Sequence, residues 1–433
     1  MKIEISNGKL FSSKNDHSKQ WKSVEKIQIT NGIIADINPE NSTFKADISI
    51  DAKGCYIIPG LIDLNVSLRE PGYTSKGSIA SETRAAAAGG VTTLCCTPDT
   101  KPINDSKAVT KLIEELSSNS QHCQVLPLGA LTKGLLGEQL SEYAALKDAR
   151  CVGLSNAYNP VKNLAITKRC FEYAKTHELS VFINPIEPSL HDGVMHENYV
   201  STTIGLQGIS SLAETIAVSQ LIQLAQATGV HLHLSQLSAA DSVKQLAAAK
   251  SEGVLVTADT AIQNLLYTDE QVENFNSVFH CLPPLRSHID RDALIEGINS
   301  GVIDAITSAH KPHEAAAKQM PFAETEPGMS SIEFLLPMAI QLQNQNISTT
   351  CLDFSRFVQA MTEGPASVLK MKKPTLEKGS QANICIFDPS KPYRVDQSTI
   401  LSTGKNTPLI NQTLKGRVIA TIFEGNISYQ LQQ

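Results

Sequence analysis

Eight short β-rich runs alternate with helical stretches through the middle of the chain, and this alternation limits the possible folds more than any other feature. The pattern favours a parallel sheet whose strands are joined by crossover helices. Eight such units over about 310 residues have the size of a TIM (β/α)8 barrel with insertions. The expected strands lie at 58–67, 91–97, 123–129, 151–155, 180–184, 230–236, 254–258 and 302–308. We therefore predict an α/β fold built around this barrel.

Two of the expected helices end at glycines. The alanine-rich segment 81–88 is followed by Gly89-Gly90, and the segment 212–228 is followed by Gly229. Glycine adopts the left-handed backbone that commonly ends a helix, because it has no Cβ to clash. We predict helices over both segments, each leading into the next strand.

The two ends of the chain have strand and turn patterns without helices. Asn7-Gly8 and Asn31-Gly32 are turn signals. The strand-like segments lie at 2–5, 26–29, 384–387 and 418–423. Neither end alone is long enough to bury much core. We therefore predict that residues 1–55 and 375–433 form one composite β-sandwich domain, and that residues 56–374 form the barrel.

The composition excludes several classes of protein. The 433 residues are 41% hydrophobic, enough for a large core, and the net charge of −6 gives no reason to expect nucleic-acid binding. We find neither an apolar run of about 18 residues nor a signal peptide, and expect a cytoplasmic protein. The nine cysteines include no C-x-x-C pair, so we expect reduced, buried thiols, with a reactive thiol as the alternative.

The residues at the carboxyl ends of the expected strands are those a TIM barrel uses for chemistry. Six such positions all carry neutral polar side chains. They are Asn65 and Ser67 on the first strand, Asn156 after the fourth, Asn184 on the fifth, Gln236 on the sixth and Ser308 on the eighth.

Several motifs resemble those of one family. Residues 58–71, IPGLIDLNVSLREP, are similar to the first-strand motif P-G-x-x-D-x-H-x-H-x-R of dihydroorotases and related amidohydrolases. PPLRS at 283–287 and SAHKPH at 308–313, for the family's D-H-A-P-H, follow in the same order. The resemblance covers nearly the whole chain and implies a barrel of the amidohydrolase type.

The resemblance also implies which positions would hold a metal. In the family, the two histidines of the first motif bind zinc, and Asn65 and Ser67 stand in their place. The other implied positions are Asn156 for a bridging carboxylate, Asn184 for a histidine, Gln236 for the second histidine of an H-x-x-H pattern that starts at His233, and Ser308 for the metal-binding aspartate that acts as general base.

These replacements remove the chemistry of the family. Zinc is held by imidazole, thiolate or carboxylate ligands, and it activates water by lowering its pKa to about 7. Amide and hydroxyl side chains bring no charge and little basicity. We therefore expect no catalytic residue, no metal, no cofactor and no dihydroorotase activity.

Three residues could still contact a ligand in the remaining pocket. Arg69 matches a family arginine that binds the substrate carboxylate, with structural ion pairing as the alternative. Asp99 stands where the family has a substrate-binding asparagine, and its negative charge would repel a carboxylate. The third is His310, next to which an unrecognised catalytic site would lie if the chain were active.

Two histidine pairs have the spacing of metal ligands. They are His231 with His233, and His310 with His313. No carboxylate is evidently placed by the sequence to complete either site, so we expect structural histidines.

Within the family, the chain is most similar to the noncatalytic dihydroorotase-like subunits of bacterial aspartate transcarbamoylase, in stretches such as REPGY, SKGSIASET and AAAAGGVT. The resemblance implies a scaffold that binds the transcarbamoylase catalytic chain, six copies of each, in pyrimidine biosynthesis. A homodimer is also compatible, and no nucleic-acid or membrane partner is expected. The alternatives are an amidohydrolase with an atypical or absent metal site, and an adaptor for another partner, like the dihydropyrimidinase-related proteins.

Overall fold

Eight parallel strands form the predicted barrel. The computed structural model describes residues 1–12, 20–40, 43–344 and 351–432. Each expected run overlaps one barrel strand, although β14 extends three residues beyond its run, and a bridge between Val66 and His310 brings the last strand back to the first. In order around the barrel, the strands are β6 (Leu61–Val66), β7 (Val91–Cys96), β8 (Gln124–Ala130), β9 (Gly153–Ser155), β10 (Ser180–Ile183), β13 (Leu232–Leu234), β14 (Val256–Ala261) and β15 (Ala305–Thr307).

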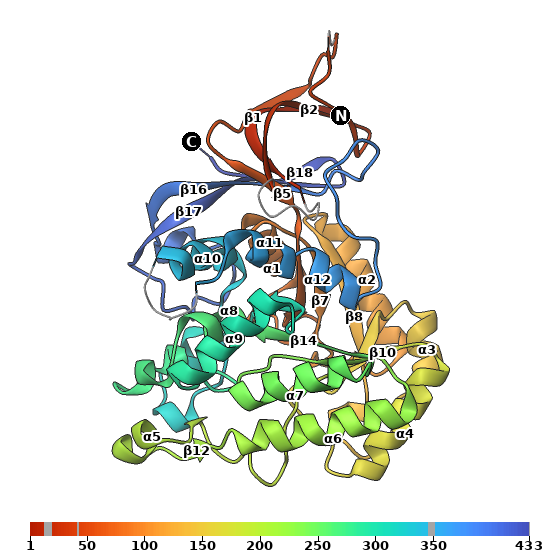
Figure 1. Cartoon of the computed structure of the whole chain (residues 1–433), viewed down its shortest axis with the longest axis vertical. Coiled ribbons are helices and arrows are strands. Elements are labelled where there is room, and N and C mark those ends of the chain that lie inside the picture. Colours follow the sequence, from red (N-terminus) through yellow and green to blue (C-terminus); the bar gives the residue numbers. More distant parts are fainter. Residues whose placement is uncertain (13–19, 41–42, 345–350, 433) are drawn as a thin grey trace.

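Helices cover the outside of the barrel, as parallel strands require. In Figure 1, α4, α6 and α7 lie side by side across its lower part. The longer helices are α1 (Ile79–Ala88), α2 (Lys107–Ser120), α4 (Leu164–Thr176), α6 (Leu212–Thr228), α7 (Ala240–Ser251), α9 (His288–Ser300) and α10 (Leu335–Asn344). The shorter helices are α3 (Tyr143–Asp148), α5 (Tyr199–Ile204), α8 (Ile262–Leu266), α11 (Phe354–Ala360) and α12 (Glu363–Val368).

Both predicted helix ends are confirmed. α1 is capped at its start by Ser78, whose hydroxyl accepts the backbone N–H of Ser81, and at its end by Gly89. α6 has the predicted bounds and ends at Gly229, whose φ of 67° is left-handed. Glycine is required there because a Cβ would be strained in this conformation.

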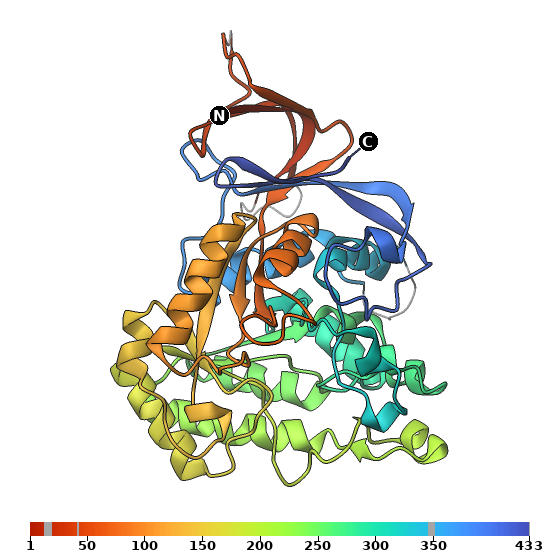
Figure 2. The same ribbon diagram turned by 180° about the vertical axis from the view of Figure 1, so that it is seen from behind.

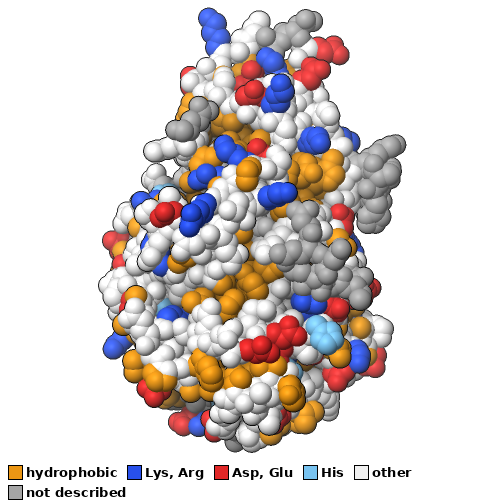
Figure 3. Space-filling view, turned by 90° about the vertical axis from the view of Figure 1, so that its left-hand side faces the viewer, with side chains coloured by type: hydrophobic (Ala, Val, Ile, Leu, Met, Phe, Trp, Pro, Cys, Tyr) orange, Lys and Arg blue, Asp and Glu red, His pale blue; other side chains and the backbone are white. Residues whose placement is uncertain are grey.

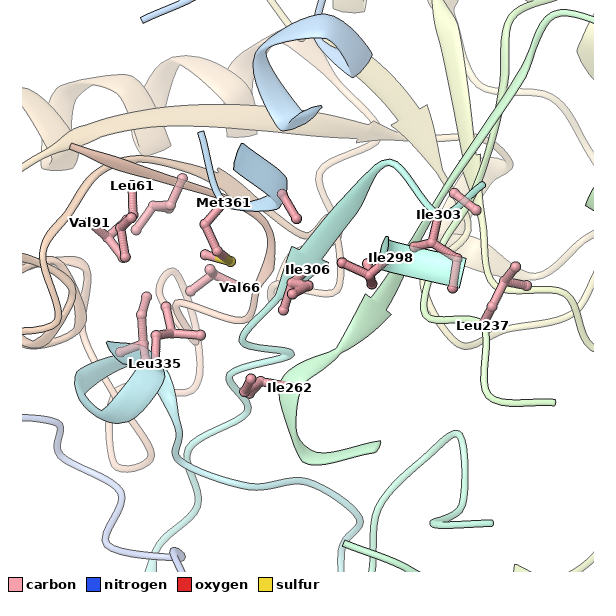
Figure 4. Packing of buried hydrophobic residues seen from close by; sticks show 14 of the residues in the cluster. Leu61, Val66, Val91, Leu237, Ile262, Ile298, Ile303, Ile306, Leu335 and Met361 are labelled. Atoms are coloured by element: carbon pink, nitrogen blue, oxygen red, sulfur yellow. The ribbon is translucent and has the colours of Figure 1, made fainter. Parts of the chain in front are cut away.

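The main hydrophobic core lies between the barrel strands and the surrounding helices. Figure 4 shows part of this layer, where Ile306 of β15 lies between Val66 and Ile298. A smaller cluster fills the inside of the barrel and includes Leu64 and Phe182. The barrel is therefore a packed body, and space for a ligand is left only near its ends.

Both ends of the chain meet in one sheet, which confirms the composite β domain. β1 pairs with β2, β4 and β5, and β5 pairs with β16, so the first and last parts of the chain share a ladder. The two ends share a core as well, and Figures 1 and 2 show this domain above the barrel. Its strands are β1 (Lys2–Phe11), β2 (Trp21–Thr30), β3 (Ile33–Ile37), β4 (Ile48–Asp51), β5 (Tyr56–Pro59), β16 (Ile384–Arg394), β17 (Thr413–Phe423) and β18 (Asn426–Gln430).

Two local predictions are wrong. Asn7-Gly8 lies inside β1, where a Cβ on Gly8 would clash with Ile57, so the glycine permits close packing and not a turn. The run 58–67 is split at Gly60 into β5 of the terminal sheet and β6 of the barrel. The split arises because Gly60 donates its N–H to the carbonyl of Asn383, which belongs to the other end of the chain.

All nine cysteines are free thiols, and eight of them are buried. Burial raises the pKa of most of these thiols, for example that of Cys281 to about 11, which keeps them protonated. Only Cys351 is exposed. Among the described residues, no helix has the length and apolar character needed to cross a membrane.

Candidate functional site

A small cavity lies at the carboxyl ends of the barrel strands. Its volume is about 40 Å³, which holds about three water molecules and is far below the ~300 Å³ of a usual ligand pocket. Four of the six expected positions line it, namely Asn65, Ser67, Asn184 and Gln236, together with Asp99 and His310. Asn156 and Ser308 do not line the cavity.

The amides and hydroxyls of the cavity bond to one another. Asn184 donates its Nδ2–H to Oε1 of Gln236 over 2.8 Å, which joins the ends of β10 and β13. The hydroxyl of Ser67 lies 3.3 Å from that of Thr97 at the end of β7. These pairs satisfy buried polar atoms without a metal, which removes the cost of leaving them unpaired.

Asn156 faces a neighbouring loop. Its Oδ1 accepts the hydroxyl of Thr132 over 2.7 Å, and its Nδ2 donates to the carbonyl of Asn159 over 2.6 Å. The cavity beside the end of β9 is lined by Ala157, the next residue. A methyl group therefore occupies the side of the cavity where a bridging carboxylate was expected.

Ser308 is fully buried and faces Asp63. Its N–H donates to Oδ1 of Asp63 over 3.2 Å, and its hydroxyl accepts the N–H of His310. The cavity is lined by Ala309, which is also the residue directly before His310, as the aspartate is in D-H-A-P-H. An alanine is even less able than a serine to bind a metal or act as a base.

The backbone at the ends of three strands is left-handed. Ala157 has a φ of 48°, Gln236 of 58° and Ala309 of 45°, and all three line the cavity. This conformation costs about 1–2 kcal/mol for a residue with a Cβ, and such strain gathers at functional sites. The chain therefore turns sharply at these three strand ends, where the side chains carry no reactive group.

His231 and His233 contact residues of the neighbouring barrel strands and have a structural role. His233 contacts Asp259 over 2.8 Å through Nε2 and the hydroxyl of Thr257 over 2.9 Å through Nδ1. His231 lies 2.8 Å from the hydroxyl of Ser180, and burial lowers its pKa to about 4. Both imidazoles are thus engaged by strand residues at positions where they have no access to the cavity of the strand ends.

His310 is tied to Glu82, a carboxylate from α1. Its Nε2 lies 2.8 Å from Oε2 of Glu82, while its Nδ1 accepts the N–H of Ser331. Because Nδ1 accepts, Nε2 carries the proton and donates to Glu82. The same carboxylate accepts the hydroxyl of Ser402 and the N–H of Thr403, and the partners together hold its pKa below the usual range. His310 therefore connects the barrel to the C-terminal segment.

Arg69 and His313 contact each other beside the cavity. Arg69 donates its Nε–H to the carbonyl of Pro312 over 2.9 Å, and its Nη2 lies 3.1 Å from Nε2 of His313. Burial and the guanidinium lower the pKa of His313 to about 2, so the imidazole is neutral and can accept. In this arrangement Arg69 is engaged by protein groups and does not line the cavity.

Two charged side chains of opposite sign line the cavity. Oδ1 of Asp99 accepts the hydroxyl of Thr97 over 2.5 Å. Nζ of Lys311 lies 6.0 Å from the centre of the Tyr158 ring. Burial lowers the pKa of Lys311, and the carboxylate of Asp99 opposes this effect. The two charges offset each other electrostatically within the cavity.

The zinc that the family motif implies does not fit this donor set. The side chains that line the cavity at or next to the six positions are the amides of Asn65, Asn184 and Gln236, the hydroxyl of Ser67 and the methyl groups of Ala157 and Ala309, whereas zinc requires imidazole, thiolate or carboxylate. The cavity is also lined by His310, Asp99 and Cys281, but His310 is bonded to Glu82 and burial raises the pKa of the Cys281 thiol. Nowhere in the described ranges do three or more His, Cys, Asp or Glu side chains gather in a metal-binding group. No step of catalysis can therefore be derived through a metal here.

Solved structures of hydantoinases share the fold over the whole chain. The L-hydantoinase (dihydropyrimidinase) from Arthrobacter aurescens matches with a TM-score of 0.85 and 21% identity, covering 100% of this chain and 96% of that one. The dihydropyrimidinase from Brevibacillus agri matches with a TM-score of 0.82 and 19% identity, covering 100% and 96%. The fold is thus the TIM barrel of the amidohydrolase type, with a β domain from both termini, as predicted.

Curated relatives define the family more closely. A "Dihydroorotase-like protein" from Pseudomonas aeruginosa is 39% identical over 431 residues, which is 99% of this chain and 100% of the relative. A protein of the same name from Pseudomonas putida is 42% identical over 407 residues, which is 94% and 95%. A "Dihydroorotase" from Syntrophotalea carbinolica is 37% identical over 432 residues, covering 100% of both. Residues 54–242 match the family model described as Dihydro-orotase-like. The chain belongs to the dihydroorotase-like family of the amidohydrolase superfamily.

Sequence reasoning missed the carboxylates that hold two of the histidines. Asp259 contacts His233, and Glu82 contacts His310. Each carboxylate comes from another element of the barrel, so the spacing of the histidines gave no signal for it. Ala309 could have been found by counting back from His310 in the D-H-A-P-H motif.

Proposed function

We propose that this protein is a noncatalytic dihydroorotase-like subunit that assembles with the catalytic chain of aspartate transcarbamoylase in pyrimidine biosynthesis. The observation that carries the proposal is the set of neutral side chains at the strand ends, where the family motifs have metal ligands and a base. A zinc-activated hydroxide is the nucleophile that such ligands would generate. The proposal therefore places catalysis in the partner, and this chain in the cytoplasm beside it.

The small size of the cavity and the hydrogen bonds across it support the proposal that this chain does not hydrolyse cyclic amides. At about 40 Å³, it leaves little room for a cyclic amide, and a second cavity of about 120 Å³ adjoins it on the far side of Asn184 and Gln236. The pair of Asn184 and Gln236 crosses the space between two strand ends. A substrate would have to displace this bond, and a neutral side chain stands where the family motif has its base.

The intact fold supports a structural role. The helix caps and terminal glycines of α1 and α6 agree with the structure, and such consistency between local pattern and fold is typical of a sequence whose folding is maintained. The name "Dihydroorotase-like protein", given to two relatives, is compatible with a family member that has lost the activity. Another relative is named "Dihydroorotase", so the alternative of an active enzyme has to be tested as well.

The test combines the purified chain with the cognate transcarbamoylase catalytic chain. Size-exclusion chromatography with light scattering measures the complex, and both activities are assayed on the fractions with and without added Zn²⁺. The Syntrophotalea carbinolica relative serves as the comparison for dihydroorotate turnover. We expect a large complex with transcarbamoylase activity and no dihydroorotase activity. Absence of a complex, or dihydroorotate turnover by this chain alone, would overturn the proposal.

A further inference from the structure

Three loop segments form a small lobe beside the mouth of the barrel. They are residues 192–206, 269–279 and 315–324, which we call the mouth lobe, and they follow β10, β14 and β15. Because they leave the carboxyl ends of these strands, they lie at the cavity end of the barrel. Met195, Val272 and Phe322, one from each segment, form a hydrophobic cluster separate from the main core. The lobe is thus one packed unit.

Polar contacts also tie the three segments together. Asn198, which caps α5, donates its Nδ2–H to the carboxylate of Asp269. Ser277 donates its hydroxyl to the carbonyl of Lys318 over 2.6 Å. These contacts hold the three segments against one another, so their exposed side chains belong to the surface of one lobe.

That surface exposes three large hydrophobic side chains, one from each segment. Tyr199 is 83% exposed, and Phe275 and Met320 are each 51% exposed. Single exposed hydrophobic residues are ordinary, but several on one small lobe mark an interaction site. Phe275 also has a left-handed backbone, with a φ of 55°. Phe275 therefore combines an exposed ring with a strained backbone, a combination that is more common at functional sites than elsewhere.

The mouth lobe is strongly acidic. Its three segments contain six carboxylates and one lysine, a net charge of −5 in a chain whose total is −6. The lysine, Lys318, is turned inward and donates to the carbonyls of Ser277 and His280. Glu270 and Glu273 are exposed on either side of Val272. The lower half of Figure 3, on the side where Figure 1 places α5, shows acidic side chains beside hydrophobic ones.

We infer that the mouth lobe is the surface through which this chain binds the transcarbamoylase catalytic chain, and this inference rests on the proposed function. The charge decides the kind of partner. A symmetric dimer through this lobe would place two groups of −5 against each other, which opposes self-association. A partner with basic residues around an apolar pocket complements both the charge and Tyr199, Phe275 and Met320.

The test measures the dissociation constant of the full-length chain and the catalytic chain by light scattering and titration calorimetry. Tyr199→Ser with Phe275→Ser is expected to weaken binding at least about 30-fold, because buried aromatic anchors dominate such interfaces. The matched control is Leu255→Ser, since Leu255 is also exposed but precedes β14, at the other end of the barrel. The control is expected to bind like wild type. All variants are compared by thermal unfolding to establish that they fold.

Charge reversal gives a second, independent readout. Glu270→Lys with Glu273→Lys is expected to weaken binding about tenfold at ~0.05 M salt and to remove most of the salt dependence seen for wild type. Its control is Lys substitution of Asp241 and Glu252, two exposed carboxylates on another element. The inference is overturned if wild type binds and both lobe variants bind equally well, or if the lobe variants instead dissociate a homodimer. If wild type forms no complex at all, the proposed function fails, and the inference with it.

Discussion

Asp63 is a fully buried carboxylate with few groups around it that stabilise its negative charge. It lies on β6, is fully buried, and accepts backbone N–H groups from Asn65 and Ser308 at 3.2 Å. Burial raises its pKa from 3.8 to about 6, although these hydrogen bonds and His310 oppose the rise. The folded protein therefore prefers the protonated acid, and ionisation of Asp63 opposes folding. We predict that the free energy of unfolding of the Asp63→Asn variant rises relative to that of wild type as the pH increases from about 5 to 8.

The expected size follows from the two pKa values. A rise from 3.8 to about 6 corresponds to about 3 kcal/mol of stability, at about 1.4 kcal/mol for each tenfold change in the dissociation constant. This stability is present below pH 3.8 and is lost as the pH rises through the folded pKa. Between about pH 5 and pH 8, the loss in wild type is roughly 1.4 kcal/mol. The amide that replaces the carboxyl group in the Asp63→Asn variant cannot ionise, so the variant lacks this loss.

The assay is urea unfolding of both proteins from about pH 5 to pH 8. The quantity compared is the difference between their free energies of unfolding, because any constant effect of the amide cancels in its pH dependence. The exposed Asp241→Asn on α7 is the control and is expected to give a flat difference. If the wild-type and Asp63→Asn profiles are parallel over this range, the reasoning about burial is refuted.

Three further predictions concern the frame around the cavity. Glu82→Gln is expected to lower the free energy of unfolding by about 1–3 kcal/mol, because the amide group cannot accept from all the donors that the carboxylate binds, which include Ser402 and Thr403. Urea unfolding measures this loss, with the exposed Glu252→Gln expected to be near neutral, and an unchanged free energy of unfolding contradicts the prediction. Tyr143→Phe removes a 2.7 Å bond to the carbonyl of Leu131 and is expected to cost about 1–3 kcal/mol in the same assay, so an unchanged midpoint would argue against that bond. In the native protein, a thiol reagent should modify Cys351 alone within minutes, whereas mass spectrometry showing several rapidly modified cysteines would contradict the burial of the others.

The barrel could be predicted because its signals are local. α6 shows this most directly: its apolar composition and the following glycine give the bounds found in the structure. Where two distant parts of the chain compete for one segment, local signals fail. The run 58–67 has uniform strand character, but residues 56–59 pair with β1 and β16, so the break at Gly60 depends on the far end of the chain.

The candidate site shows the same contrast between what local sequence determines and what distant residues determine. The neutral character of Asn65, Ser67, Asn184 and Gln236 could be read from the motifs, and all four line the cavity. The orientation of Asn156 and Ser308 could not, because it is set by Thr132 and Asp63, which lie on other parts of the barrel. Left-handed residues such as Ala309 and Ala157 shift which side chain faces the cavity by one position.

The shared terminal sheet has a consequence for synthesis. β5 emerges from the ribosome long before its neighbour β16, with roughly 325 residues between Pro59 and Ile384. At roughly 5–20 residues per second, this interval takes about 15–65 s. During that time, the edge of β5 and apolar side chains such as Ile57 and Ile3 wait without the strands that later cover them. The nascent N-terminus is therefore expected to expose apolar surface throughout this interval, and truncation before β16 should leave that surface permanently exposed.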